Sequence, residues 1–103
     1  VRPAQPDHPI DIGGMRIMPL GTPGHTEGSV CYLVPEFRIC FSGDTLFAGS
    51  VGRTDLSDGN PAHMRQSLAR ICKLDDDIRV YPGHGPLTTI HRERIENPYL
   101  AGL

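Results

Sequence analysis

Glycine and proline interrupt this chain often, and this limits it to short strands and helices. The 103 residues include 12 glycines and 10 prolines, which favour turns and break regular elements. The hydrophobic fraction is 38%, below the ~45–50% typical of soluble domains on a similar count that includes glycine. The length allows one small domain and excludes a multidomain enzyme. With so few apolar residues available to form a core, the chain is either a domain of marginal stability or part of a larger domain.

The apolar pattern predicts four strands in the first half of the chain. Residues 10–12 and 15–20 alternate in hydropathy around Gly13-Gly14, a pattern typical of a hairpin. Residues 30–34 are almost entirely apolar, and residues 37–41 alternate. The connection between these last two strands is short, so we expect them to form an antiparallel pair.

The second half predicts two helices with one strand between them. Residues 45–60 contain three glycines and show no periodic pattern of apolar residues. This indicates a long loop of the kind that lines a site. A helix follows with Asn60 as its cap, then a strand over residues 78–81, then a helix from residue 88 or 89 to about residue 96. The predicted fold class is therefore α/β (α+β), with a five-stranded, mostly antiparallel sheet and two helices on one face. Nothing obvious in the chain would cover the other face.

Charge and cysteine usage exclude several classes of partner. The formal net charge is −2, which argues against a nucleic-acid surface. No apolar stretch reaches the ~20 residues of a membrane span, so we expect no membrane partner. Cys31, Cys40 and Cys72 form no Cys-x-x-Cys pair; an odd count in apolar surroundings predicts reduced, buried thiols and a cytoplasmic protein. We also expect Tyr32, Phe41, Phe47 and Tyr81, on or beside apolar strands, to lie in the core or a pocket wall.

Three polar residues, His25, Asp44 and His84, each follow a glycine in a predicted loop. Asp44 and His84 come just after predicted strands, and His25 comes just before one. If those strands are neighbours, the three loops meet at one edge of the sheet. Two imidazoles and one carboxylate suit Zn²⁺, Fe²⁺ or Mn²⁺. The alternative is that each is an ordinary turn residue bonded to nearby backbone.

Four ordered motifs together resemble the metallo-β-lactamase superfamily, and its glyoxalase II-like (hydroxyacylglutathione hydrolase-like) branch in particular. These motifs are residues 22–29, 41–47, 52–55 and 81–85. Residues 88–100 also resemble the carboxyl end of compact bacterial members. The resemblance extends over almost the whole chain, and four motifs in the same order are far more specific than any one of them.

The resemblance implies an αββα sandwich with two metals at one edge. By resemblance, His25 is a ligand of the first metal, Asp44 bridges both metals and His84 is a ligand of the second. The implied cofactor is zinc, with iron or manganese as alternatives. A carboxylate can span two cations, which together lower the pKa of a shared water. The implied activity is hydrolysis of a small-molecule thioester by a metal-bridging hydroxide, with Asp44 as the candidate catalytic residue.

One family motif is missing from the chain. The sequence His-x-His-x-Asp-His, which supplies the other four metal ligands in the family, does not occur. We therefore expect residues 1–103 to form the carboxyl-terminal half of a single metallo-β-lactamase-like domain. The isolated chain is expected to bind metal weakly and to be inactive. Its uncovered sheet face would contact the missing amino-terminal half, or a second copy in a homo-oligomer.

Arg53 is the candidate substrate-binding residue. In the family, the basic residue of this loop faces the polar tail of the substrate, and a guanidinium pairs well with a carboxylate. The alternative is an internal bond from Arg53 to Asp55 that stiffens the loop. Ser42 and Thr45 flank Asp44 and are expected either to support it or to face solvent.

Two other functions compete with the thioester hydrolase. A persulfide dioxygenase is the first, because that family shares the wording of residues 52–55 and uses one iron. The second is a non-catalytic half-domain that acts as an assembly or binding module, which its uncovered apolar face would suit.

Overall fold

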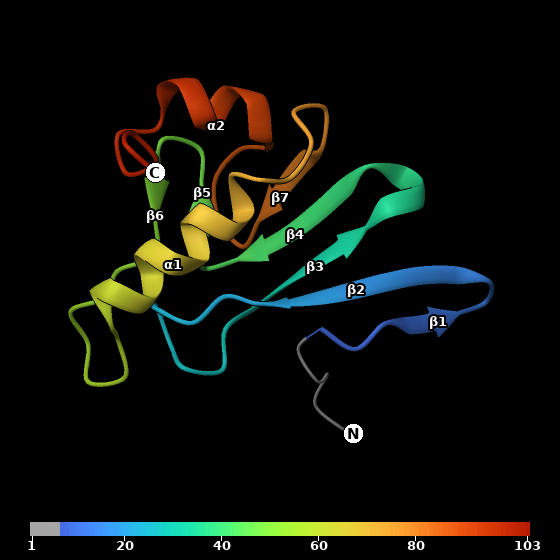
Figure 1. Cartoon of the computed structure of the whole chain (residues 1–103), viewed down its shortest axis with the longest axis horizontal. Helices are drawn as coiled ribbons and strands as arrows, with labels where there is room; N and C mark the ends of the chain where they lie inside the picture. Colours follow the sequence, from blue (N-terminus) through green and yellow to red (C-terminus); the bar gives the residue numbers. More distant parts are fainter. Residues whose placement is uncertain (1–6) are drawn as a thin grey trace.

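A six-stranded sheet in the order β1-β2-β3-β4-β7-β8 forms the centre of the molecule (Figure 1). This computed structural model describes residues 7–103. All pairings in the sheet are antiparallel except β4 with β7, which is parallel. The elements are β1 Ile10–Ile12, β2 Met15–Gly21, β3 Val30–Val34, η1 Pro35–Phe37, β4 Ile39–Gly43, β5 Leu46–Phe47, β6 Ser50–Val51, α1 Pro61–Ile71, β7 Arg79–Pro82, β8 Thr88–Thr89 and α2 Ile90–Glu96.

The first hairpin forms as the glycine pair predicts. Ile12 pairs with Met15 across the turn, and Gly13 and Gly14 have φ of 56° and 83°. A two-residue hairpin turn with positive φ at both positions matches the twist of its strands, and glycine adopts it without a steric cost. The predicted hairpin is therefore confirmed.

The strand predicted to begin at Phe37 begins later, at Ile39. Pro35–Phe37 form one turn of 3₁₀ helix, which Arg38 closes in the left-handed region at φ 54°. Proline is well suited to the first position of such a turn because its φ is already near helical values. The predicted antiparallel pair itself is confirmed, with Tyr32 opposite Phe41.

The sheet has one strand more than predicted, and the predicted loop 45–60 contains a small hairpin. Thr88–Thr89 form β8 against β7, directly before α2. Inside the loop, β5 and β6 pair as a separate two-stranded sheet. Strands of two residues are too short to show an alternating pattern in the sequence. β8 and the β5–β6 hairpin are therefore visible only from the strand pairing in the folded chain.

Both helices contribute to one hydrophobic cluster on a single face of the sheet. Met64, Leu68 and Ile71 of α1 and Ile90 of α2 are buried in it. From the strands, the cluster includes Leu20, Cys31, Cys40, Leu46 and Val80.

Among the described residues, no helix is long and apolar enough to span a membrane. The predicted mixed α/β architecture, a partial domain with two helices on a mostly antiparallel sheet, is confirmed.

The opposite face carries a row of rings, of which those of Phe41 and Tyr81 remain open to solvent. Register places Pro19, Tyr32, Phe41 and Tyr81 side by side across four strands. The Phe41 and Tyr81 ring centroids lie 5.6 Å apart, yet these residues are 44% and 36% exposed. The expectation that both lie in the core or a pocket wall is wrong. They alternate with buried Cys40 and Val80, and the helices cover only the face those residues share.

We predict that replacing the cap of α1 destabilises the domain. The Asn60 side chain accepts a hydrogen bond of 3.0 Å from the His63 backbone N–H, so Asn60→Ala should lower the free energy of unfolding by about 1 kcal/mol. Gln66→Ala, at an exposed position of the same helix, is the control and should change it by less than about 0.5 kcal/mol. Urea unfolding followed by circular dichroism measures both. Equal effects would contradict the capping role.

Candidate metal centre

The topology brings the three candidate ligands to one edge of the sheet. Asp44 directly follows β4, and His84 follows β7. Because β4 and β7 are parallel neighbours, their carboxyl ends lie at the same edge. His25 lies in the loop before β3, which runs antiparallel to β4, so this loop reaches the same edge.

Each imidazole faces a different oxygen of one carboxylate. His25 Nε2 lies 3.9 Å from Asp44 Oδ2, and His84 Nε2 lies 3.5 Å from Asp44 Oδ1. The His25 side chain is 23% exposed, whereas that of His84 is 81% exposed. The prediction that the three loops meet is confirmed, while the roles of these residues as metal ligands stay predictions.

A backbone carbonyl sets the tautomer of His25. Nδ1 of this residue lies 2.8 Å from the Arg53 carbonyl oxygen. Because a carbonyl only accepts, Nδ1 carries the proton and donates it. In the neutral ring, Nε2 then keeps a free lone pair directed toward Asp44, which is the form in which histidine binds a metal.

The chemistry of this donor set fits a divalent cation, but only in part. Two imidazole nitrogens and two carboxylate oxygens are the donors that zinc and iron accept in proteins. Within residues 7–103, however, no group of three or more histidine, cysteine, aspartate or glutamate side chains forms a complete metal-binding arrangement. The described residues therefore supply a partial set, in which Asp44 is shared by both imidazoles.

Two buried hydroxyl groups hold the turn that carries Asp44. Ser42 Oγ donates to the Leu46 carbonyl at 2.7 Å, and Thr45 Oγ1 lies 3.3 Å from Thr22 Oγ1. Ser42 and Thr45 are both 1% exposed. The alternative that they face solvent is wrong, since they support Asp44 through the backbone of its turn.

Gly52 lies against the backbone of Asp44, and no side chain fits there. A Cβ at this position would lie 1.8 Å from the Asp44 carbonyl oxygen and 3.2 Å from Cβ of His25. The Gly52 N–H donates to the Thr45 carbonyl at 3.1 Å, which holds the two segments together. A glycine is thus required for Asp44 and His25 to approach each other.

The Arg53 side chain is bonded to Asp55, which was one of the two roles predicted for it. Its Nε and a terminal nitrogen donate to the two oxygens of Asp55 at 2.8 and 2.9 Å. The guanidinium lowers the pKa of the Asp55 carboxyl to about 2, and the pKa of Arg53 is raised in turn by the same bond. The segment that supplies the carbonyl partner of His25 is therefore braced by this pair.

Sequence reasoning did not identify Glu93 and Asn97 as site residues. Glu93 is 1% exposed and accepts hydrogen bonds from the Gly49 N–H at 2.8 Å and the Thr88 hydroxyl at 2.6 Å. Asn97 donates to Glu93 Oε1 at 3.0 Å and to the Ser50 carbonyl at 3.1 Å. These bonds fasten the β5–β6 hairpin to α2. The signal in the sequence is the resemblance of residues 88–100, which include both side chains, to the carboxyl end of family members.

The hairpin forms one wall of a cavity of about 430 Å³ around the candidate ligands. Phe47 of β5 lies beside His84, with ring centroids 6.2 Å apart. The cavity is lined by His25, Asp44, Phe47, Ser50, Val51, Gly52, Arg53 and His84. The site thus combines metal-binding side chains with a partly apolar wall.

We predict that Gly52→Ala disrupts the site while an unhindered glycine tolerates the same change. The added methyl group would overlap the Asp44 carbonyl, so the free energy of unfolding should fall by about 1–3 kcal/mol or more. Gly28→Ala is the matched control, because a Cβ there meets nothing within 4 Å. Urea unfolding measures the stability, and the imidazole NMR signals of His25 report the local change. An unaltered Gly52→Ala protein would refute the close approach.

A second prediction concerns the Arg53–Asp55 pair. The Asp55 pKa is lowered from 3.8 to about 2, so the ion pair persists from neutral pH down to that range. Because the folded-state pKa lies below the unfolded one, the stabilisation is present above pH ~3.9 and is lost as the pH falls toward 2. Carboxyl ¹³C NMR should show this titration, and Arg53→Ala should return it to an ordinary value. An unshifted Asp55 in the parent chain would contradict the pairing.

Comparison with known proteins identifies relatives of this chain. The family model for the metallo-β-lactamase superfamily matches residues 2–84. Hydroxyacylglutathione hydrolase GloC of Haemophilus influenzae is 37% identical over 92 residues, which are 88% of this chain and 43% of the relative.

Two solved structures are similar in both fold and sequence. ETHE1 from Myxococcus xanthus matches with a TM-score of 0.88 and 36% identity, covering 96% of this chain and 45% of that one. A protein solved in a di-iron-bound form matches with a TM-score of 0.86 and 43% identity, covering 97% and 48%. The chain spans about half the length of these relatives. By both sequence and fold, it belongs to the metallo-β-lactamase superfamily.

Proposed function

We propose that this chain carries part of the active site of a metal-dependent thioester hydrolase. The observation that supports this most directly is the placement of two imidazole nitrogens against opposite oxygens of the Asp44 carboxylate. A carboxylate held in this way is suited to bridge two cations, with His25 beside one and His84 beside the other. The donor types agree with either zinc or iron.

Bound cations would supply a water of lowered pKa and an electrophile for the acyl oxygen. The residues of this chain hold and shape the site. Asp44 would hold both cations, the Arg53 carbonyl keeps the proton of His25 on Nδ1, and the Phe47 ring lies beside His84. In the overall reaction, water adds to the acyl carbon, the carbon–sulfur bond breaks, and the products are a carboxylic acid and a thiol.

The thioester assignment rests on a relative. GloC carries the name hydroxyacylglutathione hydrolase, which denotes cleavage of an acylated thiol. We propose the same reaction class here, with Arg53 pairing with an anionic group of the thiol portion. Arg53 is bonded to Asp55, but both side chains are more than 60% exposed. Exposed ion pairs contribute little free energy, so a substrate carboxylate can compete for the guanidinium.

Further metal ligands must come from residues outside this chain. The described residues form no complete metal-binding arrangement, and the chain spans 43–48% of its relatives. We propose that the exposed rings of Phe41 and Tyr81 on the open sheet face pack against the segment that supplies these ligands. The isolated chain is then expected to bind a cation weakly and to hydrolyse thioesters poorly.

A persulfide dioxygenase is the second candidate function. It is favoured by residues 52–55, whose sequence resembles that of the persulfide dioxygenase family. Two histidines and one carboxylate also form the ligand set of many mononuclear iron oxygenases. Oxygen uptake with a glutathione persulfide supports this candidate, and thiol release from a thioester without oxygen uptake supports the hydrolase.

We predict that Asp44→Asn weakens binding of divalent cations by at least about tenfold, since the amide loses the charge and one metal-binding oxygen. Calorimetric titration of the chain with Zn²⁺ and Fe²⁺ measures the affinity. Asp11→Asn is the matched control, because Asp11 is an exposed carboxylate on β1. If Asp44→Asn binds as the parent does, or if both variants lose equally, Asp44 is not the bridging ligand. Tight stoichiometric zinc with rapid turnover by the isolated chain would contradict the need for outside ligands.

A further inference from the structure

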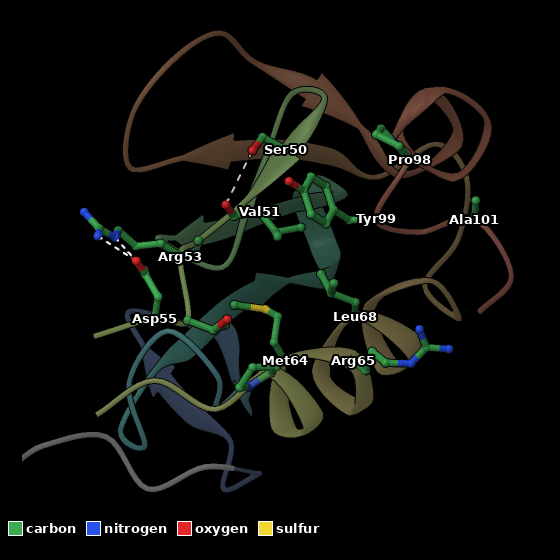
Figure 2. A pocket seen from close by; sticks show the side chains of 13 residues that line it. Ser50, Val51, Arg53, Asp55, Met64, Arg65, Leu68, Pro98, Tyr99 and Ala101 are labelled. Carbon is green, nitrogen blue, oxygen red and sulfur yellow. Dashed lines mark hydrogen bonds and ion pairs between the residues drawn. The ribbon is translucent and has the colours of Figure 1, made fainter. Parts of the chain in front are cut away.

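A second cavity lies beside the candidate metal centre (Figure 2). Its volume is about 700 Å³, within the range of small-molecule sites. The segment from Ser50 to Arg53 lines both this cavity and the one around Asp44. The two cavities are therefore neighbours that share one short stretch of backbone as lining.

The interior of this second cavity is mainly apolar. Figure 2 shows Val51, Met64, Leu68 and Tyr99 gathered around it from β6, α1 and the carboxyl-terminal turn. Met64 and Leu68 are core residues that are 4% and 2% exposed, so each contributes a small, fixed area to the lining, whereas Tyr99 is 56% exposed and offers a larger surface. Such a surface gains free energy by burying hydrocarbon.

The charged groups of the lining do not provide an anion site inside it. The Arg53 guanidinium is directed away from the cavity and is bonded to Asp55. Arg65 extends outward from α1 at the other side. An anionic ligand would have no cation at the apolar part of the lining, which favours an uncharged, apolar occupant.

We propose that this cavity binds the apolar acyl chain of the substrate whose reacting carbonyl lies at Asp44. The proposal rests on the thioester hydrolase assignment and narrows its substrate class. Substrates with an extended hydrocarbon acyl group are preferred over short hydroxyacyl groups such as lactoyl, because only the former reach past Ser50–Arg53 and cover the exposed ring of Tyr99. The thiol portion stays on the Asp44 side, near Arg53.

The chain contains its own reporters for this test. Its three methionines are Met64, which lines the cavity, and Met15 and Met18 on β2, which do not line it. We would label the methionine methyl groups with ¹³C and titrate the chain with hydrolysis-resistant thioethers of N-acetylcysteamine. The S-alkyl groups are butyl, hexyl and octyl, and 2-hydroxypropyl replaces lactoyl as the polar probe. Binding is thereby measured without turnover.

The expected result is a shift of the Met64 methyl signal with Met15 and Met18 unchanged. Affinity should rise about fourfold for each added methylene, and 2-hydroxypropyl should bind weakest. Tyr99→Ala should reduce the affinity for the octyl probe several-fold, while Tyr81→Ala, which removes a partly exposed ring on the opposite sheet face, should not. The two-dimensional methyl spectrum also shows whether each variant is folded.

Three outcomes would overturn the proposal: no dependence on alkyl length, equal shifts at all three methionines, or equal losses in the two tyrosine variants. The test is separable from the hydrolase assignment. Chain-length-dependent binding without thioester cleavage by a metal-loaded, longer protein would refute the activity and leave the cavity assignment standing. Thioester cleavage at rates independent of acyl length would support the hydrolase activity and refute the cavity assignment.

Discussion

The parallel pairing of β4 with β7 is the constraint on which the site depends. It aligns the carboxyl ends of two strands, so Asp44 and His84 leave the sheet at the same edge, and antiparallel β3 brings the His25 loop to meet them. A parallel neighbour requires a long crossover, which the loop after Asp44 and α1 provide. The same crossover packs Met64, Leu68 and Ile71 onto the sheet, so one topological choice creates both the core and the site.

Backbone contacts then determine how closely the site residues approach. Gly52 has no side chain, and a Cβ at this position would overlap the Asp44 carbonyl and crowd His25. The Arg53 carbonyl orients the His25 ring. Glu93 and Asn97 hold the neighbouring β5–β6 hairpin through buried hydrogen bonds. Buried polar groups are costly unless they are paired, and here the pairing fixes the wall between the two cavities. The buried side chains of Glu93 and Asn97 thus position the β5–β6 hairpin rather than fill the hydrophobic core.

The low apolar fraction has a structural counterpart. Helices cover one sheet face, and the rings of Phe41 and Tyr81 on the other face remain in solvent. The chain nevertheless superposes on solved relatives of about twice its length with TM-scores of 0.86 to 0.88. Its local packing is therefore that of the family, while one face has the composition of an interior surface.

The sequence by itself determined the elements with strong local signals: the Gly13-Gly14 hairpin, the Asn60-capped helix, the β3–β4 pair and the family motifs around His25, Asp44 and His84. Turn chemistry and hydrophobic period act between near neighbours, so they can be read directly. The exposure of Phe41 and Tyr81, the two-residue strands, the need for glycine at position 52 and the buried Glu93–Asn97 pair were decided only by the tertiary structure. Each depends on contacts between residues far apart in the chain, or on which sheet face the helices cover, and neither leaves a local pattern.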